Sequence, residues 1–136
     1  MQPIRNEDQI NALTRKIIGC AMEVHNTIGN GFQEVIYQRA LAIEFKFQGL
    51  SFDREKEMPL TYRGQSIGTR RVDFFVEQKV MVEIKAIEQL LPVNKTQAFN
   101  YCEAYNIADG LLINFGAMSL EFKRVYNKYL VQPTTT

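Results

Sequence analysis

The chain has 136 residues, 46% hydrophobic and 23% charged, with a formal net charge of +1. These values are ordinary for a soluble globular protein of one domain over 1–136 and do not decide for or against a polyanionic partner. Two cysteines without CxxC spacing and a single histidine argue against a disulfide framework or a structural zinc site. No apolar signal core or membrane-length run is present, so we expect a cytoplasmic protein without membrane contact.

The first part of the chain predicts two helices. Apolar residues recur at spacings of three or four over 10–28, which indicates an amphipathic helix. The glycines in 29–31 permit the left-handed backbone that ends such a helix. A second helix is predicted over 32–47 and closed by Gly49.

The middle of the chain predicts strands. The first covers 52–62, where Pro59 indicates an edge strand or a bulge. A turn with two glycines is expected over 62–68. Two further strands are predicted over 70–76 and 80–87.

The last part predicts a helix over 93–105, a short apolar strand over 111–115, and a strand followed by a helical turn within 120–130. The resulting order, α-α-β-β-β-α-β-β, predicts an α/β domain whose central sheet carries helices on its faces. About 1–8 and 131–136 are expected to be flexible.

Two neighbouring strands carry charged residues among apolar ones: Asp73 on the first, Glu83 and Lys85 on the second. Side chains alternate faces along a strand, so Glu83 and Lys85 share a face while Val82 turns to the core. A three-residue loop at 77–79 would place Asp73 opposite Glu83. A two-residue loop would place it opposite Val82, and the two acids would diverge.

Two facing carboxylates repel each other unless a cation lies between them. Mg²⁺ takes carboxylate oxygens and keeps several waters, which suits two acids at the edge of a cleft. Lys85 could then neutralise developing negative charge. The alternative is a surface hairpin whose acids and bases form cross-strand ion pairs.

Two helices add polar pairs. Glu34 and Tyr37 lie one turn apart, and Gln97 and Tyr101 are spaced i, i+4 on one helix face. Each pair also has a structural explanation. Glu34 suits the dipole at a helix start, Tyr37 could be a core aromatic with its hydroxyl at the rim, and the later pair could lie on a half-exposed helix.

This ordered set of a helical Glu, a strand Asp, E-x-K and Q-x-x-x-Y resembles the PD-(D/E)xK nuclease superfamily. Within it, the chain is similar to the small bacterial family named for a GxxExxY motif, present here as Gly31, Glu34 and Tyr37. The resemblance covers about Ile10 to Asn127. It implies a restriction-endonuclease-like core with a central mixed sheet flanked by helices.

The resemblance also implies residue roles. The metal ligands would be three carboxylates and one backbone carbonyl: Asp73, Glu83, Glu34 and the carbonyl of Ile84. The residues that orient the water, the site or the phosphate would be Lys85, Glu34, Gln97 and Tyr101. The implied reaction is Mg²⁺- or Mn²⁺-dependent hydrolysis of a phosphodiester in nucleic acid, with DNA favoured over RNA.

Cations are expected around this site: Arg54, Lys56, Arg63, Arg70, Arg71, Lys85 and Lys95. By strict alternation only Arg71 of the adjacent arginines shares the face of Asp73. Together with Lys95 and Tyr37 it is the expected contact for nucleic acid.

His25 could act as a base, but a supporting role in its helix is favoured over catalysis. A catalytically inactive binding or accessory module stays open as an alternative function. Exposed aromatics such as Tyr126 and Tyr129 also leave a homo-oligomer open.

Overall fold

The computed structural model describes residues 5–131. The ends that the sequence predicts to be flexible lie partly outside this range, at 1–4 and 132–136. Residues 5–8 are instead held in place. The Asn6 side chain caps the first helix by accepting the Gln9 amide at 3.0 Å, and Arg5 forms an ion pair with Asp109.

The element order predicted from the sequence is confirmed. The helices are α1 (Glu7–Ile28), α2 (Glu34–Phe47) and α3 (Pro92–Ala104). The strands are β1 (Phe52–Tyr62), β2 (Gln65–Val76), β3 (Val80–Lys85), β4 (Asp109–Asn114) and β5 (Glu121–Tyr126). No helix within 5–131 is long and apolar enough to cross a lipid bilayer.

The strands form one mixed sheet in the order β1-β2-β3-β4-β5. Only β3 and β4 run parallel, and α3 makes the crossover between them. The other neighbours are antiparallel. β1 is therefore an edge strand, which accommodates Pro59 because an edge position does not need its missing N–H.

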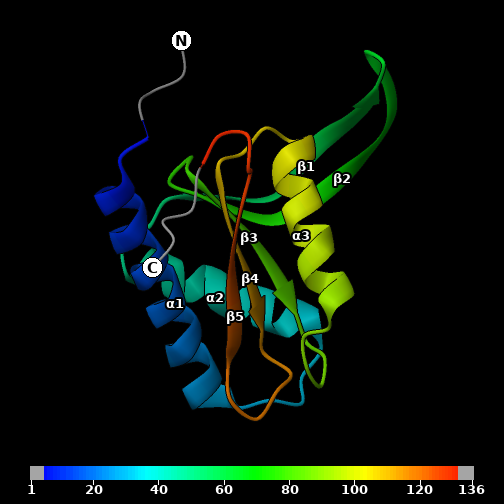
Figure 1. The fold of residues 1–136 in the computed structure, drawn as a ribbon. Coiled ribbons are helices and arrows are strands. Elements are labelled where there is room, and N and C mark those ends of the chain that lie inside the picture. The colour runs from blue at the N-terminus through cyan, green and yellow to red at the C-terminus, as the bar shows by residue number, and fades with distance from the viewer. Residues whose placement is uncertain (1–4, 132–136) are drawn as a thin grey trace.

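Two apolar cores lie on opposite faces of this sheet. α1 and α2 cover one face, where Phe45 packs edge-on against Phe74 at a centroid distance of 5.1 Å. α3 covers the other face through Ala98 and Cys102 (Figure 1). Both cysteines are buried and free, as their apolar surroundings predict.

β2 is longer than the sequence predicts. The glycine-containing stretch after Tyr62 forms a tight turn at Arg63 and Gly64, both with positive φ, and Gln65 already pairs with Tyr62. β1 and β2 therefore extend together as a ribbon beyond the rest of the sheet (Figure 1). Gly68 allows this extension because its φ of 145° is open to glycine and not to other residues.

Candidate active site at the edge of strand β3

The β2–β3 hairpin has the register that a three-residue loop predicts, with Val76 opposite Val80 and Phe74 opposite Val82. Without a glycine, the loop adopts positive φ at Glu77 and Gln78. This is a costly backbone conformation for residues with side chains. Continued by one step, the register would bring Asp73 opposite Glu83, but the ladder stops at Phe74.

The regular alternation of β2 breaks at Asp73, because Val72 packs in the core on the α3 side and Phe74, two residues later, in the core on the α1 and α2 side. Arg54 pairs with Phe74 and Lys56 with Val72, so Glu55 and Asp73 are left unpaired between them, and Glu55 has a φ of 55°. The Asp73 carboxylate replaces the missing ladder contact. Its Oδ2 accepts the Ile84 amide at 2.7 Å.

α2 supplies the second partner of Asp73. Gln38 is buried, and its Nε2 donates to Asp73 Oδ1 at 3.0 Å. Its Oε1 accepts from the guanidinium of Arg54 at 2.8 Å. Gln38 does not stand out in the sequence, although its position one turn after Glu34 is a signal that indicates it.

Glu83 projects toward α3. It lies two residues after Met81 in β3 and therefore shares the face on which Met81 packs in the core. Its side chain is 4% exposed, and Arg70 Nη1 and Nη2 lie 3.0 and 3.1 Å from its two oxygens. The expectation that Asp73 and Glu83 pair on one face is thus contradicted, because the Asp73 carboxylate is directed to Gln38 of α2 and the Glu83 carboxylate to Arg70 on the α3 side. Both acids still lie beside β3, since Asp73 also accepts the Ile84 amide.

The expectation that Arg71, and not Arg70, stands beside the acids is wrong. Arg70 binds Glu83, while Arg71 lies 66% exposed near Glu55 and Glu57. Simple alternation fails because Val72 and Phe74 pack on opposite faces of the sheet, so the residues before Asp73 are turned relative to those after it.

Tyr101 of α3 lies beneath Arg70, with the guanidinium carbon 3.9 Å from the ring centroid. The ring also stacks on Tyr105 at 5.9 Å. Gln97, one turn earlier, is exposed, and Lys95 is half-buried near the start of the same helix. Tyr101 therefore reaches the acids through Arg70, and Gln97 presents its amide to solvent.

Glu34 is the first residue of α2 and is exposed at the mouth of a pocket of about 280 Å³. Gln38, Glu55 and Asp73 line the same pocket. The Glu34 carboxylate therefore faces the Asp73 side of the site.

Tyr37 does not face this pocket, and its predicted contact with nucleic acid is contradicted. The side chain is 0% exposed, stacks on Phe115 at 4.8 Å and donates a hydrogen bond to the Gly29 carbonyl at 2.5 Å. It also accepts the Phe32 amide at 3.3 Å. Tyr37 therefore holds the α1–α2 loop in place, so that Glu34 begins its helix at the site.

Lys85 is half-buried at the end of β3, opposite Asn114 of β4. Asn114 is fully buried and was also missed from sequence. Its side chain accepts the Ile87 amide at 3.0 Å and donates to the Ile87 carbonyl at 2.9 Å. These bonds fix the chain directly after Lys85. Among the described residues, no acidic side chain forms an ion pair with the Lys85 ammonium.

His25 lies in α1, buried, with Nε2 2.9 Å from the Ala117 carbonyl. Because a carbonyl only accepts, His25 donates from Nε2. The bond ties α1 to the loop that follows β4.

Burial dominates the electrostatics of the three acids. It raises the pKa of Glu83 to about 6, against the opposing hydrogen bonds from Arg70. It also raises the pKa of Asp73, although the Ile84 amide and Gln38 oppose the change. The pKa of Glu34 is raised by partial burial and then by the charge of Asp73. For each acid, burial outweighs the neighbouring cations Arg70 and Lys85, which lower the pKa.

This donor set fits a hard divalent cation. Oxygen ligands from two carboxylates and a carbonyl, with water completing the shell, are typical of Mg²⁺. Arg70 shows that Glu83 already accommodates a cation in its buried setting. No group of three or more His, Cys, Asp or Glu side chains within 5–131 is spaced to form a cage around a metal by itself. Asp73, Glu83 and the Ile84 carbonyl are the residues that could hold an ion.

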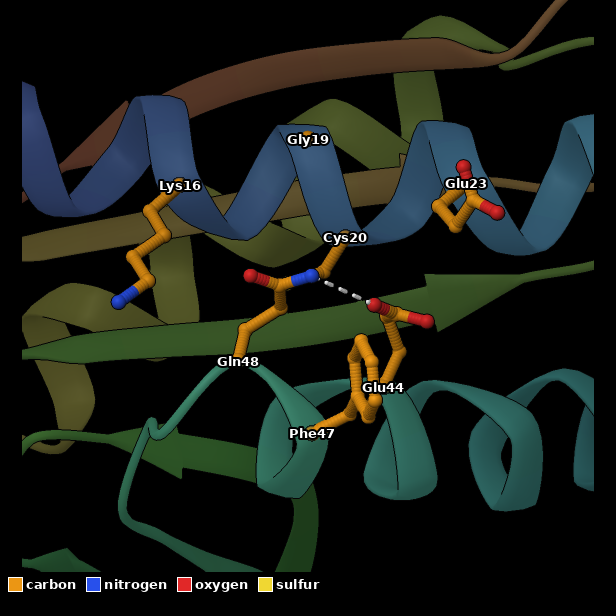
Figure 2. A pocket seen from close by; sticks show the side chains of 7 residues that line it. All are labelled: Lys16, Gly19, Cys20, Glu23, Glu44, Phe47 and Gln48. Carbon is orange, nitrogen blue, oxygen red and sulfur yellow. Dashed lines mark hydrogen bonds between the residues drawn. The ribbon is translucent and has the colours of Figure 1, made fainter.

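A pocket of about 500 Å³ lies elsewhere, between α1 and α2 (Figure 2). Figure 2 shows the Gln48 amide directed at Glu44, with which it forms a 3.1 Å hydrogen bond. Cys20 also lines this pocket, but burial raises the pKa of its thiol to about 11. The thiol is therefore neutral near pH 7 and a poor nucleophile.

Comparisons with known proteins address the fold and the family. The structure described as the crystal structure of SSO0001 is similar at a TM-score of 0.55 and 17% identity. The match covers 69% of this chain and 50% of that one, so this chain spans about half the length of its neighbour. No curated protein gives a significant match. Residues 11–125 match the PD-(D/E)XK nuclease superfamily, and the chain therefore belongs to that superfamily.

Proposed function

We propose that this chain is a divalent-metal-dependent nuclease that hydrolyses phosphodiester bonds in nucleic acid, with DNA as the favoured substrate and Mg²⁺ or Mn²⁺ as the cofactor. The observation that carries the proposal is that Asp73 and Glu83 both lie beside the C-terminal part of β3, next to Lys85. Both carboxylates have a pKa raised by burial, which a bound cation would reverse. Acids whose pKa is raised by burial in such an arrangement are typical of functional sites.

In this proposal Asp73, Glu83 and the Ile84 carbonyl hold the ion, and Glu34 approaches it from the pocket mouth. The ion, when bound, stabilises the negative charge that develops on the phosphoryl oxygens. Lys85 orients the attacking water and shares that stabilisation, since its ammonium has no acidic partner among residues 5–131.

The side chains around the site bind the polyanion. Arg71 is 66% exposed, Gln97 is exposed and Lys95 is half-buried. These groups can bind phosphates without reading the base sequence. Contacts from cationic and polar side chains to the sugar-phosphate backbone fix the position of the nucleic acid but do not distinguish its bases. Tyr37 has no part in this contact because it is buried.

A second candidate function is a binding module that does not cleave. The bidentate contact between Arg70 and Glu83 favours it, because a guanidinium already supplies the positive charge that an ion would bring. The two functions differ in metal binding and in turnover.

The test is a panel of plasmid, duplex DNA, single-stranded DNA and RNA, each with Mg²⁺, Mn²⁺ or EDTA. Wild-type protein should cleave at least one substrate with metal, and Lys85→Ala should lower the rate by about a hundredfold or more. Lys79→Ala is the matched control, because Lys79 is exposed just before the opposite end of β3 and should keep the wild-type rate. Metal binding by calorimetry without cleavage of any substrate would favour the binding module. Absence of both would contradict the nuclease.

A further inference from the structure

Arg70 makes the most complete set of contacts of any cation near the acids. Its two terminal nitrogens lie 3.0 and 3.1 Å from the two oxygens of Glu83. Nη1 also donates to the Arg71 carbonyl at 3.2 Å. The flat side of the guanidinium rests on Tyr101, at 3.9 Å from the ring centroid. This geometry fixes the group in position and in plane.

The contact occupies both oxygens of a carboxylate that the proposed function assigns to metal binding. Glu83 is 4% exposed and Arg70 28% exposed. A divalent cation on Glu83 would stand within a few ångströms of the guanidinium, and two like charges so close repel each other strongly. Arg70, which is the more exposed partner, is the group that can move.

Once released, Arg70 remains beside the site because β2 anchors its backbone at the base of the β1–β2 ribbon. A guanidinium presents a planar fork of donors that matches two phosphate oxygens, and it is always charged. Tyr101 still offers its face as a platform for that plane.

The other arginines lack this combination. Arg54 is bound to Gln38, and Arg71 is 66% exposed and faces Glu55 and Glu57. Arg5 binds Asp109 through two contacts of 2.8 Å, at the opposite end of β4 from Asn114.

We propose that Arg70 is the phosphate-positioning residue of this site, held on Glu83 until a divalent cation replaces it there. The inference rests on the proposed function, since it takes Glu83 as a metal ligand. It goes further because it assigns Arg70 two mutually exclusive partners. Arg70 binds the Glu83 carboxylate when no metal is bound, and it binds a substrate phosphate when metal is bound.

The first test uses metal alone. Arg70→Gln removes the competing charge, so the Kd for Mn²⁺ by titration calorimetry should fall about tenfold from wild type. Without metal, Arg70→Gln should lower Tm because Glu83 is left buried and unpaired, and saturating Mn²⁺ should restore it.

Arg5→Gln is the matched control. Arg5 and Asp109 form a similar bidentate pair, 25% and 6% exposed. Arg5→Gln should also lower Tm, but its Tm deficit relative to wild type should persist in saturating Mn²⁺, because its Kd for Mn²⁺ should equal that of wild type.

The second test uses a fluorescein-labelled DNA duplex and anisotropy, in a Lys85→Ala background that prevents turnover. Arg70→Gln should weaken DNA binding about tenfold with saturating Mn²⁺ and leave it unchanged in EDTA, where Arg70 is held on Glu83.

Equal loss of DNA binding with and without metal would overturn the exchange of partners. The exchange is also overturned if wild type binds Mn²⁺ and cleaves nucleic acid but Arg70→Gln has the same Kd for Mn²⁺ as wild type. In that case the nuclease proposal stands. If neither wild type nor Arg70→Gln binds Mn²⁺, both proposals fail.

Discussion

Replacing Glu83 by glutamine should change how the stability of the metal-free protein depends on pH. Burial raises the pKa of Glu83 from the ordinary 4.5 to about 6 in the folded protein. Because the folded-state pKa is the higher one, the protonated acid favours folding below pH 4.5, and that advantage is lost as the pH rises through about 6. At about 1.4 kcal/mol for each pKa unit, the advantage is about 2 kcal/mol.

Glutamine resembles the protonated acid and does not titrate, so Glu83→Gln should lack this dependence. Urea unfolding in EDTA from pH 4 to pH 8 measures both proteins. The wild-type free energy of unfolding minus that of Glu83→Gln should fall by about 2 kcal/mol across the range. Saturating Mg²⁺ at pH 8 should stabilise wild type more than the variant, because the ion needs the carboxylate.

Glu77→Gln is a control with the opposite sign. Hydrogen bonds from the hydroxyl and the amide of Ser51 lower the pKa of Glu77. Its carboxylate therefore stabilises the fold above its unfolded pKa, and this contribution is lost as the pH falls. Wild type minus Glu77→Gln should rise with pH. A flat or rising difference for Glu83→Gln would refute the assignment of Glu83 as an acid whose pKa is raised by burial.

Two further substitutions, each paired with a control substitution, test the surroundings of the site. Gln38→Leu should lower the free energy of unfolding by about 2 kcal/mol in urea, because Asp73 loses a buried donor, whereas Gln48→Leu, at an exposed residue, should change it little. Gly116→Ala should cost about 2 kcal/mol or more, because a Cβ there would lie 2.4 Å from backbone atoms of Ile87. Gly19→Ala in α1 meets nothing within 4 Å and should instead stabilise by about 1 kcal/mol in the same assay.

The sequence predicted the elements well because each has a single strong signal. Apolar spacing gave α1 to within three residues at its start, and Gly29 ends it with a φ of 74°. The hairpin register followed from loop length and from the pairing of two apolar strands, Val76 with Val80. The start of β2 was missed because the glycines at 64 and 68 resemble a long turn, whereas they permit a tight turn and an extended ribbon.

The site was predicted less completely than the fold. Asp73, Glu83 and Lys85 stand out in sequence because charge is unexpected among buried strand residues. Gln38 and Arg70 do not stand out, since a glutamine on a helix and an arginine on a long ribbon are ordinary surface residues. Only the tertiary contacts with Asp73 and Glu83 distinguish them.

The break in side-chain alternation at Asp73 explains both why Arg70, and not Arg71, lies on Glu83 and why the site exists. If β2 continued its ladder with β3, Ile84 would bond to backbone and not to a carboxylate, and no acid would lie between these two strands. By breaking the ladder, the chain gives a buried amide a charged acceptor and turns that acceptor toward Gln38. The irregularity also changes the facing of the preceding residues, which places Arg70 on Glu83. Asp73 and Arg70 therefore depend on one backbone feature, and a substitution that restores a regular ladder should displace both.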